Sequence, residues 1–404
     1  MSETVTKRGA FRGFERDEYT DRIRRLREAL EPLGLDGALL LQRVDLIYYT
    51  GAAYQGALAV PAKGEPKLYV WRGTGRIGER TPLEPQFVRG MGKLGKALVE
   101  DGFGSWKRVG MEEDVVPVAI WKRVGMATWP EAEFKDISTA IRTQRSVKSP
   151  AELQVVRRSG KVTAAGFEAL RQILKPGMPE YEVQVQFEVV TRRLGDQAAG
   201  RTRGFNAEAR GVVAAGPSAA EDTAFDGPIG QPGRNLFAPM GAGNRSIREN
   251  EPIIIDVALG VDGYMTDMTR TYYCGEIDSK FHEAHRFCLY VVEELQKKMV
   301  PGAVPEELYL WAVEEAERAG FAEGFMNRGD NKVRFLGHGI GLEMDEWPVL
   351  AKRFTAPLVE GNVIALEPKV IFEDGGVGLE ETFIVKEGRA EVVTPMERGL
   401  IKCG

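Results

Sequence analysis

Five side chains that can bind metal ions stand in strand-like or glycine-flanked segments of the C-terminal half, and they constrain the fold more than any other feature. They are Asp256, Asp267, His338, Glu367 and Glu380. The apolar run Ile253–Ile255 predicts a strand, Val261-Asp262-Gly263 a turn, and Tyr264–Tyr273 the returning strand. The two aspartates flank this turn, so we expect them to face each other across a hairpin.

The chemistry of the set indicates a metal site. Burying several carboxylates without counter-charge is unfavourable, and two divalent cations would supply that charge. Oxygen-rich ligation with a single imidazole suits Mn, Fe, Co or Zn. Two such ions about 3.5–4 Å apart can polarise a carbonyl and lower the pKa of a shared water. We therefore interpret the five residues as ligands of two divalent metal ions rather than as ordinary acids at strand ends.

The segments that carry these residues resemble the pita-bread, M24-type metallopeptidase family, which includes prolidase, aminopeptidase P, methionine aminopeptidase and the non-peptidase creatinase. The matching segments read IDVALGVDGYMTDMTRT, GHGIGLEMDEWP, ALEPKV and GLEETFIV. The N-terminal half resembles, more loosely, the creatinase/prolidase N-terminal domain. The resemblance implies that Asp256 chelates one metal, that His338 and Glu367 hold the other, and that Asp267 and Glu380 bridge both.

Together these features predict an α/β (α+β) protein of two domains. Residues 1–148 would form a small creatinase/prolidase-like domain, and residues 149–404 a pita-bread catalytic domain. The boundary precedes Ser149-Pro150-Ala151-Glu152, a capping box with proline at the first helical position. The helix–Pro-Gly–helix pattern at Pro176 recurs at Pro301, and we interpret this recurrence as the internal pseudo-twofold of the pita-bread fold.

The N-terminal half shows alternating helix and strand patterns. A helix is predicted over Asp17–Leu33, with Ile23, Leu26, Ala29 and Leu30 on one face. The other predicted elements are strands at Gly37–Gln42, Leu46–Thr50, Lys67–Trp71 and Arg108–Met111 and a helix at Lys93–Glu100. The hexapeptide WKRVGM occurs at Trp106–Met111 and again at Trp121–Met126, and we interpret this repetition as coincidence.

Two positions depart from the family pattern. The segment GPSAAEDT places Thr223, and the segment HGIGLEMDEWP places Asp345, where the peptidases carry histidines. Of the three histidines in the chain, His282 and His285 lie on a predicted helix, which leaves no spare imidazole. In the peptidases these histidines are thought to position the scissile carbonyl and shuttle protons, so their absence argues against ordinary proline-peptide cleavage.

Further residues have candidate roles at the site. Glu367 would accept or relay a proton. Asp345 would act as a general base, pair with a cationic substrate group, or form a salt bridge with a neighbouring Lys or Arg. Thr223 and Trp347 are candidate substrate-binding residues, and core packing is the alternative for Trp347. Arg270 is expected in a structural salt bridge, and Glu381 on the strand face opposite Glu380.

The Gly- and Pro-rich segment Phe225–Asn250 has two open interpretations. It either shapes the substrate pocket or only lengthens a surface connection.

We expect a dinuclear-metal hydrolase that cleaves a C–N (peptide or amide) bond in a small molecule or short peptide. The nearest activities are those of Xaa-Pro dipeptidase and aminopeptidase P. One alternative is a non-peptidase pita-bread enzyme: a creatinase-like amidinohydrolase, an ectoine-type hydrolase or a metal-dependent lyase. The other is a non-catalytic binding protein, against which the complete ligand set argues.

Composition limits the partners and the location. A net charge of −5 argues against nucleic acid as a partner. The absence of a run of about 18 apolar residues argues against a membrane partner. The three cysteines lack C-x-x-C spacing, which argues against a disulfide framework or a thiolate metal site, and we expect Cys274 to be a core residue. With no signal-peptide pattern, we expect a cytoplasmic protein. The family resemblance implies a homodimer.

Overall fold

The chain divides into two compact units, Met1–Arg145 and Ser146–Gly404. The computed structural model describes residues 13–403, apart from positions 74, 76, 78–80, 198–199, 206–207, 209–210 and 239. Each unit has a hydrophobic core of its own. The architecture is the expected α/β one, with helices packed on several sheets.

In the described part of the first unit, a mixed sheet has the strand order β4-β3-β2-β1-β5-β6. The central strand β1 pairs antiparallel with β2 and parallel with β5. The strands are β1 (Gly37–Leu40), β2 (Gln55–Pro61), β3 (Lys67–Arg72), β4 (Pro85–Phe87), β5 (Arg108–Met111) and β6 (Glu133–Asp136). The helices are α1 (Arg16–Leu30), α2 (Arg43–Thr50), α3 (Leu94–Glu100), α4 (Val118–Ile120) and α5 (Ser138–Ser146).

Most predicted elements of this unit are confirmed, namely α1, β1, β3, α3 and β5. Ile23, Leu26 and Leu30 are buried as expected, whereas Ala29 is exposed. The strand predicted at Leu46–Thr50 is wrong, because these residues belong to α2. The Gln42 side chain accepts a hydrogen bond from the Asp45 amide and caps this helix, which β propensity alone does not reveal. The second WKRVGM copy is helical and the first ends in β5, as expected for a coincidence.

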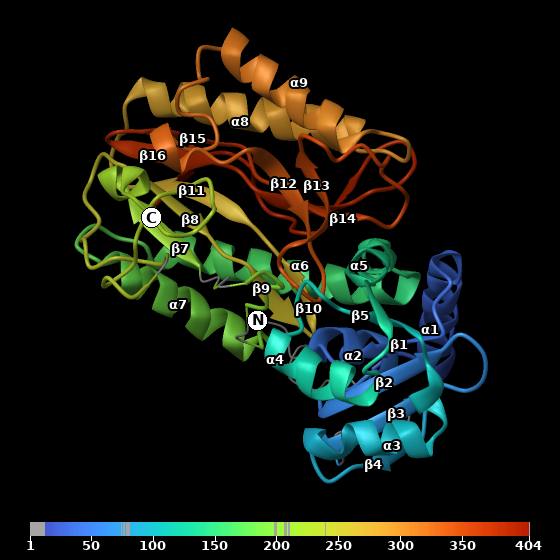
Figure 1. Ribbon diagram of the computed structural model, residues 1–404. Coiled ribbons are helices and arrows are strands. Elements are labelled where there is room, and N and C mark those ends of the chain that lie inside the picture. Colours follow the sequence, from blue (N-terminus) through green and yellow to red (C-terminus); the bar gives the residue numbers. More distant parts are fainter. Residues whose placement is uncertain are drawn as a thin grey trace. The chain divides into compact units, whose positions relative to one another are not determined.

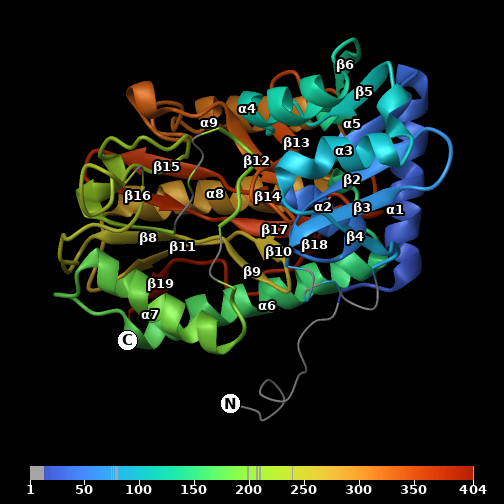
Figure 2. The same cartoon turned by 60° about the horizontal axis from the view of Figure 1, so that its bottom comes forward.

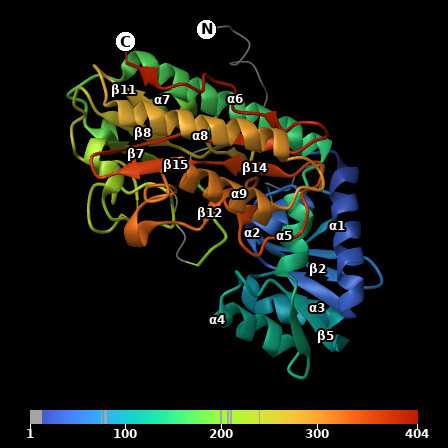
Figure 3. The same cartoon turned by 90° about the horizontal axis from the view of Figure 1, so that it is seen from above.

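In the second unit, strands lie between two pairs of helices (Figures 1 and 3). The pairs are α6 (Pro150–Ile173) with α7 (Glu180–Arg193), and α8 (Ser279–Lys298) with α9 (Pro305–Arg318). Helix α6 lies against the hairpin of β9 (Leu259–Val261) and β10 (Tyr264–Thr266) (Figure 2). Helix α8 lies against the hairpin of β15 (Lys369–Phe372) and β16 (Gly375–Gly378). Among the described residues, none of the helices combines the length and apolar character required to cross a bilayer.

The strands of this unit form two larger sheets and two small hairpins. The sheet β19-β11-β8-β7 contains β7 (Val212–Ala215), β8 (Pro252–Asp256), β11 (Thr269–Tyr273) and β19 (Ile401–Lys402). The sheet β13-β12-β14-β17-β18 contains β12 (Phe335–Gly339), β13 (Glu346–Ala351), β14 (Val363–Leu366), β17 (Glu381–Ile384) and β18 (Glu391–Val392). The hairpins pair β9 (Leu259–Val261) with β10 (Tyr264–Thr266), and β15 (Lys369–Phe372) with β16 (Gly375–Gly378).

The capping box that opens α6 is confirmed. The Ser149 hydroxyl accepts a hydrogen bond from the Glu152 amide, and the Glu152 carboxylate accepts one from the Ser149 amide. After α6 and α7 the chain forms β7 and a long hairpin, and after α8 and α9 it forms β12, β13 and a second long hairpin. This repeated order is in line with an internal pseudo-twofold.

Both long hairpins are interrupted at their middle, and these interruptions position the site. In the first, β8 pairs with β11 and the tip continues as β9–β10. In the second, β14 pairs with β17 and the tip continues as β15–β16. An antiparallel bridge between Thr269 and Glu380 joins the two interruptions, so side chains from both hairpins converge there.

One disulfide is present, although the cysteine spacing argued against a disulfide framework. Cys274 and Cys403 are bonded, with Cα atoms 5.0 Å apart. The parallel pairing of β11 with β19 places Tyr273 opposite Lys402 and so brings the residues that follow together. Cys274 is buried, as predicted for a core residue. Local spacing could not reveal this pair, because the two cysteines are 129 positions apart.

His285 on α8 is expected to make stability depend on pH. It is 3% exposed, and its Nε2 has no hydrogen-bond partner among the described residues. Burial, with Arg270 and His282 nearby, lowers the pKa of His285 from 6.5 to about 4. Between these values the unfolded chain binds the proton and the folded chain does not, so stability falls as the pH falls. From pH 7 to pH 4 this residue should reduce the free energy of unfolding by about 3 kcal/mol.

Urea unfolding at several pH values measures this effect. His285→Leu should remove that part of the pH dependence, seen as a difference from the native protein that changes with pH. The partly exposed His282 supplies the control, since His282→Gln should leave most of the dependence in place because burial is the main cause of the shift. If the unfolding free energies of native protein and His285→Leu change with pH in parallel, the prediction is contradicted.

Candidate metal centre

The predicted ligands sit where the two long hairpins are interrupted. Asp256 ends β8 and Asp267 precedes β11, while Glu367 follows β14 and Glu380 precedes β17. The fifth ligand, His338, lies on β12, which pairs with β14. The structure therefore brings all five predicted ligands into one region, within the second unit.

The expected register of the two aspartates is wrong by two positions. Asp256 pairs with Thr269, not with Asp267. The returning strand breaks at Asp267, whose amide donates to the Thr382 hydroxyl 2.9 Å away instead of continuing the ladder. This break aims the Asp267 carboxylate at residues of the other hairpin.

Two overlapping groups of side chains could each hold a metal ion. One is Asp267, His338 and Glu380, and the other is Asp256, Glu367 and Glu380. Within each group the ligand atoms lie within 4.8 Å of one another. All these residues are buried except Asp256, which is partly exposed.

A residue that sequence reasoning missed, Lys369, lies inside the second group. Its Nζ is 2.6 Å from Glu367 Oε2, 3.0 Å from Glu380 Oε2 and 3.2 Å from Asp256 Oδ2. The side chain is 0% exposed. Burial would lower the pKa of Lys369, but these carboxylates outweigh it and raise that pKa well above its ordinary value. The available signal was a lysine that opens an apolar strand directly after Glu367-Pro368.

The environment of Glu380 indicates that a divalent ion would fit beside Lys369. Its Oε2 accepts hydrogen bonds from the Thr269 hydroxyl at 2.7 Å and from Lys369. Its Oε1 is buried and has no hydrogen-bond partner among the described residues. A buried carboxylate oxygen left unpaired is costly, and a cation among Asp267, His338 and Glu380 would satisfy it.

Because the site carboxyl groups are buried, their ionisation is unfavourable unless a cation is bound. Burial raises the pKa of Asp256 to about 6, although Lys369 opposes this shift. Burial and the neighbouring carboxylates, Glu380 first, raise the pKa of Asp267 well above its ordinary value. For His338, burial lowers the pKa, but the surrounding carboxylates outweigh it and leave the pKa raised. A divalent ion would relieve the repulsion among these acids.

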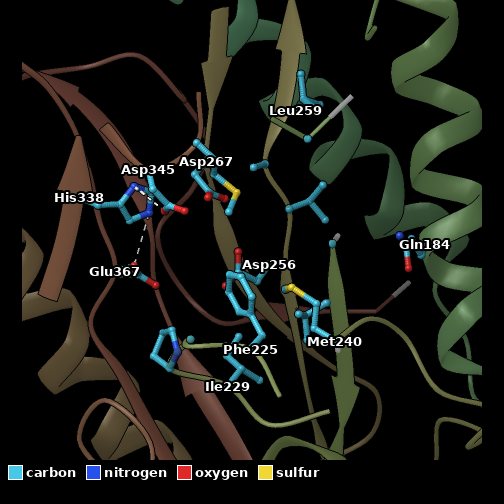
Figure 4. Close-up of a pocket in the computed structure, with 18 of the residues that line it drawn as sticks. Gln184, Phe225, Ile229, Met240, Asp256, Leu259, Asp267, His338, Asp345 and Glu367 are labelled. Atoms are coloured by element: carbon cyan, nitrogen blue, oxygen red, sulfur yellow. Dashed lines mark ion pairs between the residues drawn. The ribbon is translucent and has the colours of Figure 1, made fainter. Parts of the chain in front are cut away.

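A cavity of about 410 Å³ opens beside the ligands (Figure 4). Asp256, Asp267, His338 and Glu367 line its polar side. Phe225, Ile229 and Met240 line an apolar side, and all three come from the segment Phe225–Asn250. Of the two interpretations of that segment, the structure therefore favours a role in shaping the pocket.

Asp345 also lines the cavity, with a half-exposed side chain. Its Oδ1 is 3.9 Å from Nδ1 of His338 (Figure 4). Among the described residues it forms no salt bridge with a Lys or Arg, so that alternative finds no support. A role as general base or as partner of a cationic substrate group remains.

Two candidate substrate-binding residues do not line the cavity. The Thr223 hydroxyl accepts a hydrogen bond from the Phe225 amide at 3.3 Å. The Trp347 ring packs against Phe354, with ring centroids 6.4 Å apart. Their roles in substrate binding stay predictions.

The structural role predicted for Arg270 is confirmed. It is 0% exposed, and its guanidinium is 2.7 Å from Oε1 of Glu381. Glu381 also pairs with Arg398, so it faces away from the metal groups as expected. Arg270 additionally donates to the Glu380 carbonyl, which ties this ion pair to a ligand-bearing backbone.

The fold and the site together define a metal-dependent hydrolase. Residues 154–387 match Metallopeptidase family M24, and residues 22–147 match the Creatinase/Prolidase N-terminal domain. The chain belongs to metallopeptidase family M24, as its resemblance to the pita-bread enzymes implied.

Curated relatives and solved structures agree with this assignment. The chain is 26% identical over 392 residues to a Xaa-Pro dipeptidase of Pyrococcus horikoshii, covering 95% of this chain and all of that protein. It is 27% identical over 270 residues to a Xaa-Pro dipeptidase of Pyrococcus furiosus, covering 67% and 69%. Its fold is similar to a Xaa-Pro dipeptidase from Bacillus anthracis, with a TM-score of 0.80, 23% identity and coverage of 95% and 99%.

Proposed function

We propose that this protein hydrolyses a C–N bond in a short peptide or small amide, with a divalent metal ion held by Asp267, His338 and Glu380. The observation that carries this proposal is the buried Oε1 of Glu380, which has no hydrogen-bond partner within the part of the chain that the structure describes. The relatives named Xaa-Pro dipeptidase support a dipeptide with proline in second position as the nearest substrate.

The bound ion and the cavity residues would have different roles in the reaction. A bound Mn, Fe, Co or Zn ion would supply Lewis-acid polarisation of the carbonyl and activation of a water. Glu367 lines the cavity, with Oε1 3.6 Å from His338 Nε2, and would take a proton from water and pass it to the leaving nitrogen. Its Oε2 accepts from Lys369, which holds the carboxylate in place. The wall of Phe225, Ile229 and Met240 would receive an apolar substrate group.

A substrate screen with metal-loaded protein tests the proposal. Xaa-Pro dipeptides, longer peptides with proline in second position, and small amides would be incubated with Mn, Co or Zn. We expect hydrolysis that a chelator abolishes and that added metal restores. Binding of metal and ligands without any turnover would instead support a non-catalytic binding protein.

A second candidate is a non-peptidase hydrolase or lyase of the same fold, such as an amidinohydrolase or an ectoine-type enzyme. One observation favours it. His338 is the only histidine that lines the cavity among the described residues, because His282 and His285 lie on α8. Prolidase-level cleavage of Ala-Pro would exclude this candidate, and turnover confined to small amides or guanidines would support it.

We predict that Asp345 recognises a positively charged substrate group. In the cavity, acids outnumber basic groups among the described residues, and Arg192 is already paired with Glu188 and Asp196. A half-exposed ion pair contributes about 1 kcal/mol, so Asp345→Asn should raise KM for a substrate with a free amine roughly three- to tenfold. An N-acetylated analogue of that substrate should show no such change.

Steady-state kinetics on both substrates measures this difference. An unchanged KM for the free amine would remove the binding role. A fall in kcat on both substrates, with KM unchanged, would assign Asp345 to proton transfer instead.

Assembly and location remain predictions from the sequence. We propose a homodimer, from the family resemblance, and a cytoplasmic protein, from the composition. Size-exclusion chromatography with light scattering measures the first, and cell fractionation measures the second.

A further inference from the structure

The ammonium of Lys369 lies inside the second of the two groups of side chains that could hold a metal ion. The three carboxylates around it, from Asp256, Glu367 and Glu380, are the same three that form the second metal-binding group. The longest of the three contacts is 3.2 Å, so Nζ is within hydrogen-bonding distance of every member.

The fold is built to admit this lysine. Lys369 opens β15 and pairs with Gly378 of β16. A Cβ added at Gly378 would come within 2.4 Å of Cγ of Lys369, so the glycine leaves the space through which the lysine stem passes. The stem places the ammonium among these carboxylates, and the lysine side chain itself is 0% exposed.

In Glu367 and in Glu380, one carboxylate oxygen contacts Lys369 and the other points to a second cation position. Glu367 gives Oε2 to Lys369 and turns Oε1 toward His338. Glu380 accepts from Lys369 through Oε2, and its Oε1 has no partner within the described ranges of the chain. One position is therefore filled by the chain itself, and the other, on the side of Asp267 and His338, is left for an ion.

We propose that Lys369 replaces one of the two metal ions, so that the protein binds a single divalent ion per chain, at Asp267, His338 and Glu380. This inference rests on the proposed metal-dependent function and revises the count of two expected from the ligand set. A second divalent ion in the group around Lys369 would lie within a few ångströms of Nζ, and like charges repel strongly in a buried site.

Metal stoichiometry tests the inference without any need for a substrate. Protein would be loaded with excess Mn²⁺, freed of unbound metal and analysed for metal per chain. We expect one ion in the native protein and two in Lys369→Ala, which removes the charge and opens the space. Lys148 offers a matched control, because it is equally buried but pairs with Glu346 outside both groups. Lys148→Ala should still bind one ion.

The outcomes separate this inference from the proposed function. Two ions in the native protein would overturn the role of Lys369 and leave metal-dependent hydrolysis intact. No bound ion would overturn both proposals. One ion in both the native protein and a folded Lys369→Ala would show that Lys369 does not set the count. Even if the variant fails to fold, the metal content of the native protein shows whether it binds one ion or two.

Electron paramagnetic resonance gives an independent readout. The native Mn²⁺ protein should show the signal of isolated ions. The Lys369→Ala protein should show spin coupling between neighbouring ions, because two metals in such a site lie about 3.5–4 Å apart. A coupled signal from the native protein would contradict the inference.

Discussion

Replacement of His338 by alanine is expected to reduce kcat on a Xaa-Pro dipeptide by about 10³-fold or more, and to deplete the metal. His338 is the only imidazole in the ligand set and is buried beside Asp267 and Glu380. Bound metal contributes several kcal/mol of transition-state stabilisation, and each 1.36 kcal/mol is worth tenfold in rate. Because His338 is not a member of the hydrophobic clusters of the second unit, the variant should still fold.

Elemental analysis, steady-state kinetics and thermal unfolding of the apo protein measure the three parts of this prediction. His282→Ala is the control, since His282 lies on α8 outside the cavity and should change neither metal content nor turnover. If His338→Ala retains native metal content and native kcat, His338 is not a ligand and the proposed centre is wrong.

Replacement of Glu381 by alanine is expected to cost about 3–5 kcal/mol of unfolding free energy. Its partner Arg270 is 0% exposed, and loss of Glu381 would leave that guanidinium charge buried without a counter-ion. Among the residues that the structure describes, the remaining partners of Arg270 would be backbone carbonyls, including those of Thr269 and Glu380. Such bonds satisfy donors but do not neutralise the charge.

Denaturant unfolding of metal-free protein measures this cost without a contribution from bound metal. Glu314→Ala serves as the comparison, because it breaks an exposed pair with Arg318 and should leave stability almost unchanged. Equal, small effects of the two substitutions would show that the buried pair is not important for stability.

Much of the candidate site could be predicted from local sequence. Each of the five ligands stands beside an apolar run or a glycine pair, and such surroundings predict strand ends whose side chains converge. The start of α6 was predictable for a similar reason, because Ser149 and Glu152 cap each other within one turn. In both cases the sequence signal depends only on residues within a few positions of one another.

The register of the metal hairpin could not be predicted in the same way. A turn at Val261-Asp262-Gly263 predicts a continuous ladder, in which Asp256 and Asp267 would face each other. The ladder breaks because the Asp267 amide bonds to Thr382, which is 115 positions away. The residues near the turn carry no signal of a hydrogen-bond acceptor on a distant strand.

The sequence by itself determined the family, the candidate ligands and the helix that opens the second unit, because those features depend on recognisable residue types in short segments. Only the tertiary structure decided that Lys369 enters the site, that Cys274 meets Cys403, and that Phe225–Asn250 forms part of the pocket wall. These three results depend on packing between segments distant in the chain. In particular, the ammonium of Lys369 can take the place of a metal ion only because the two interrupted hairpins place carboxylates around it.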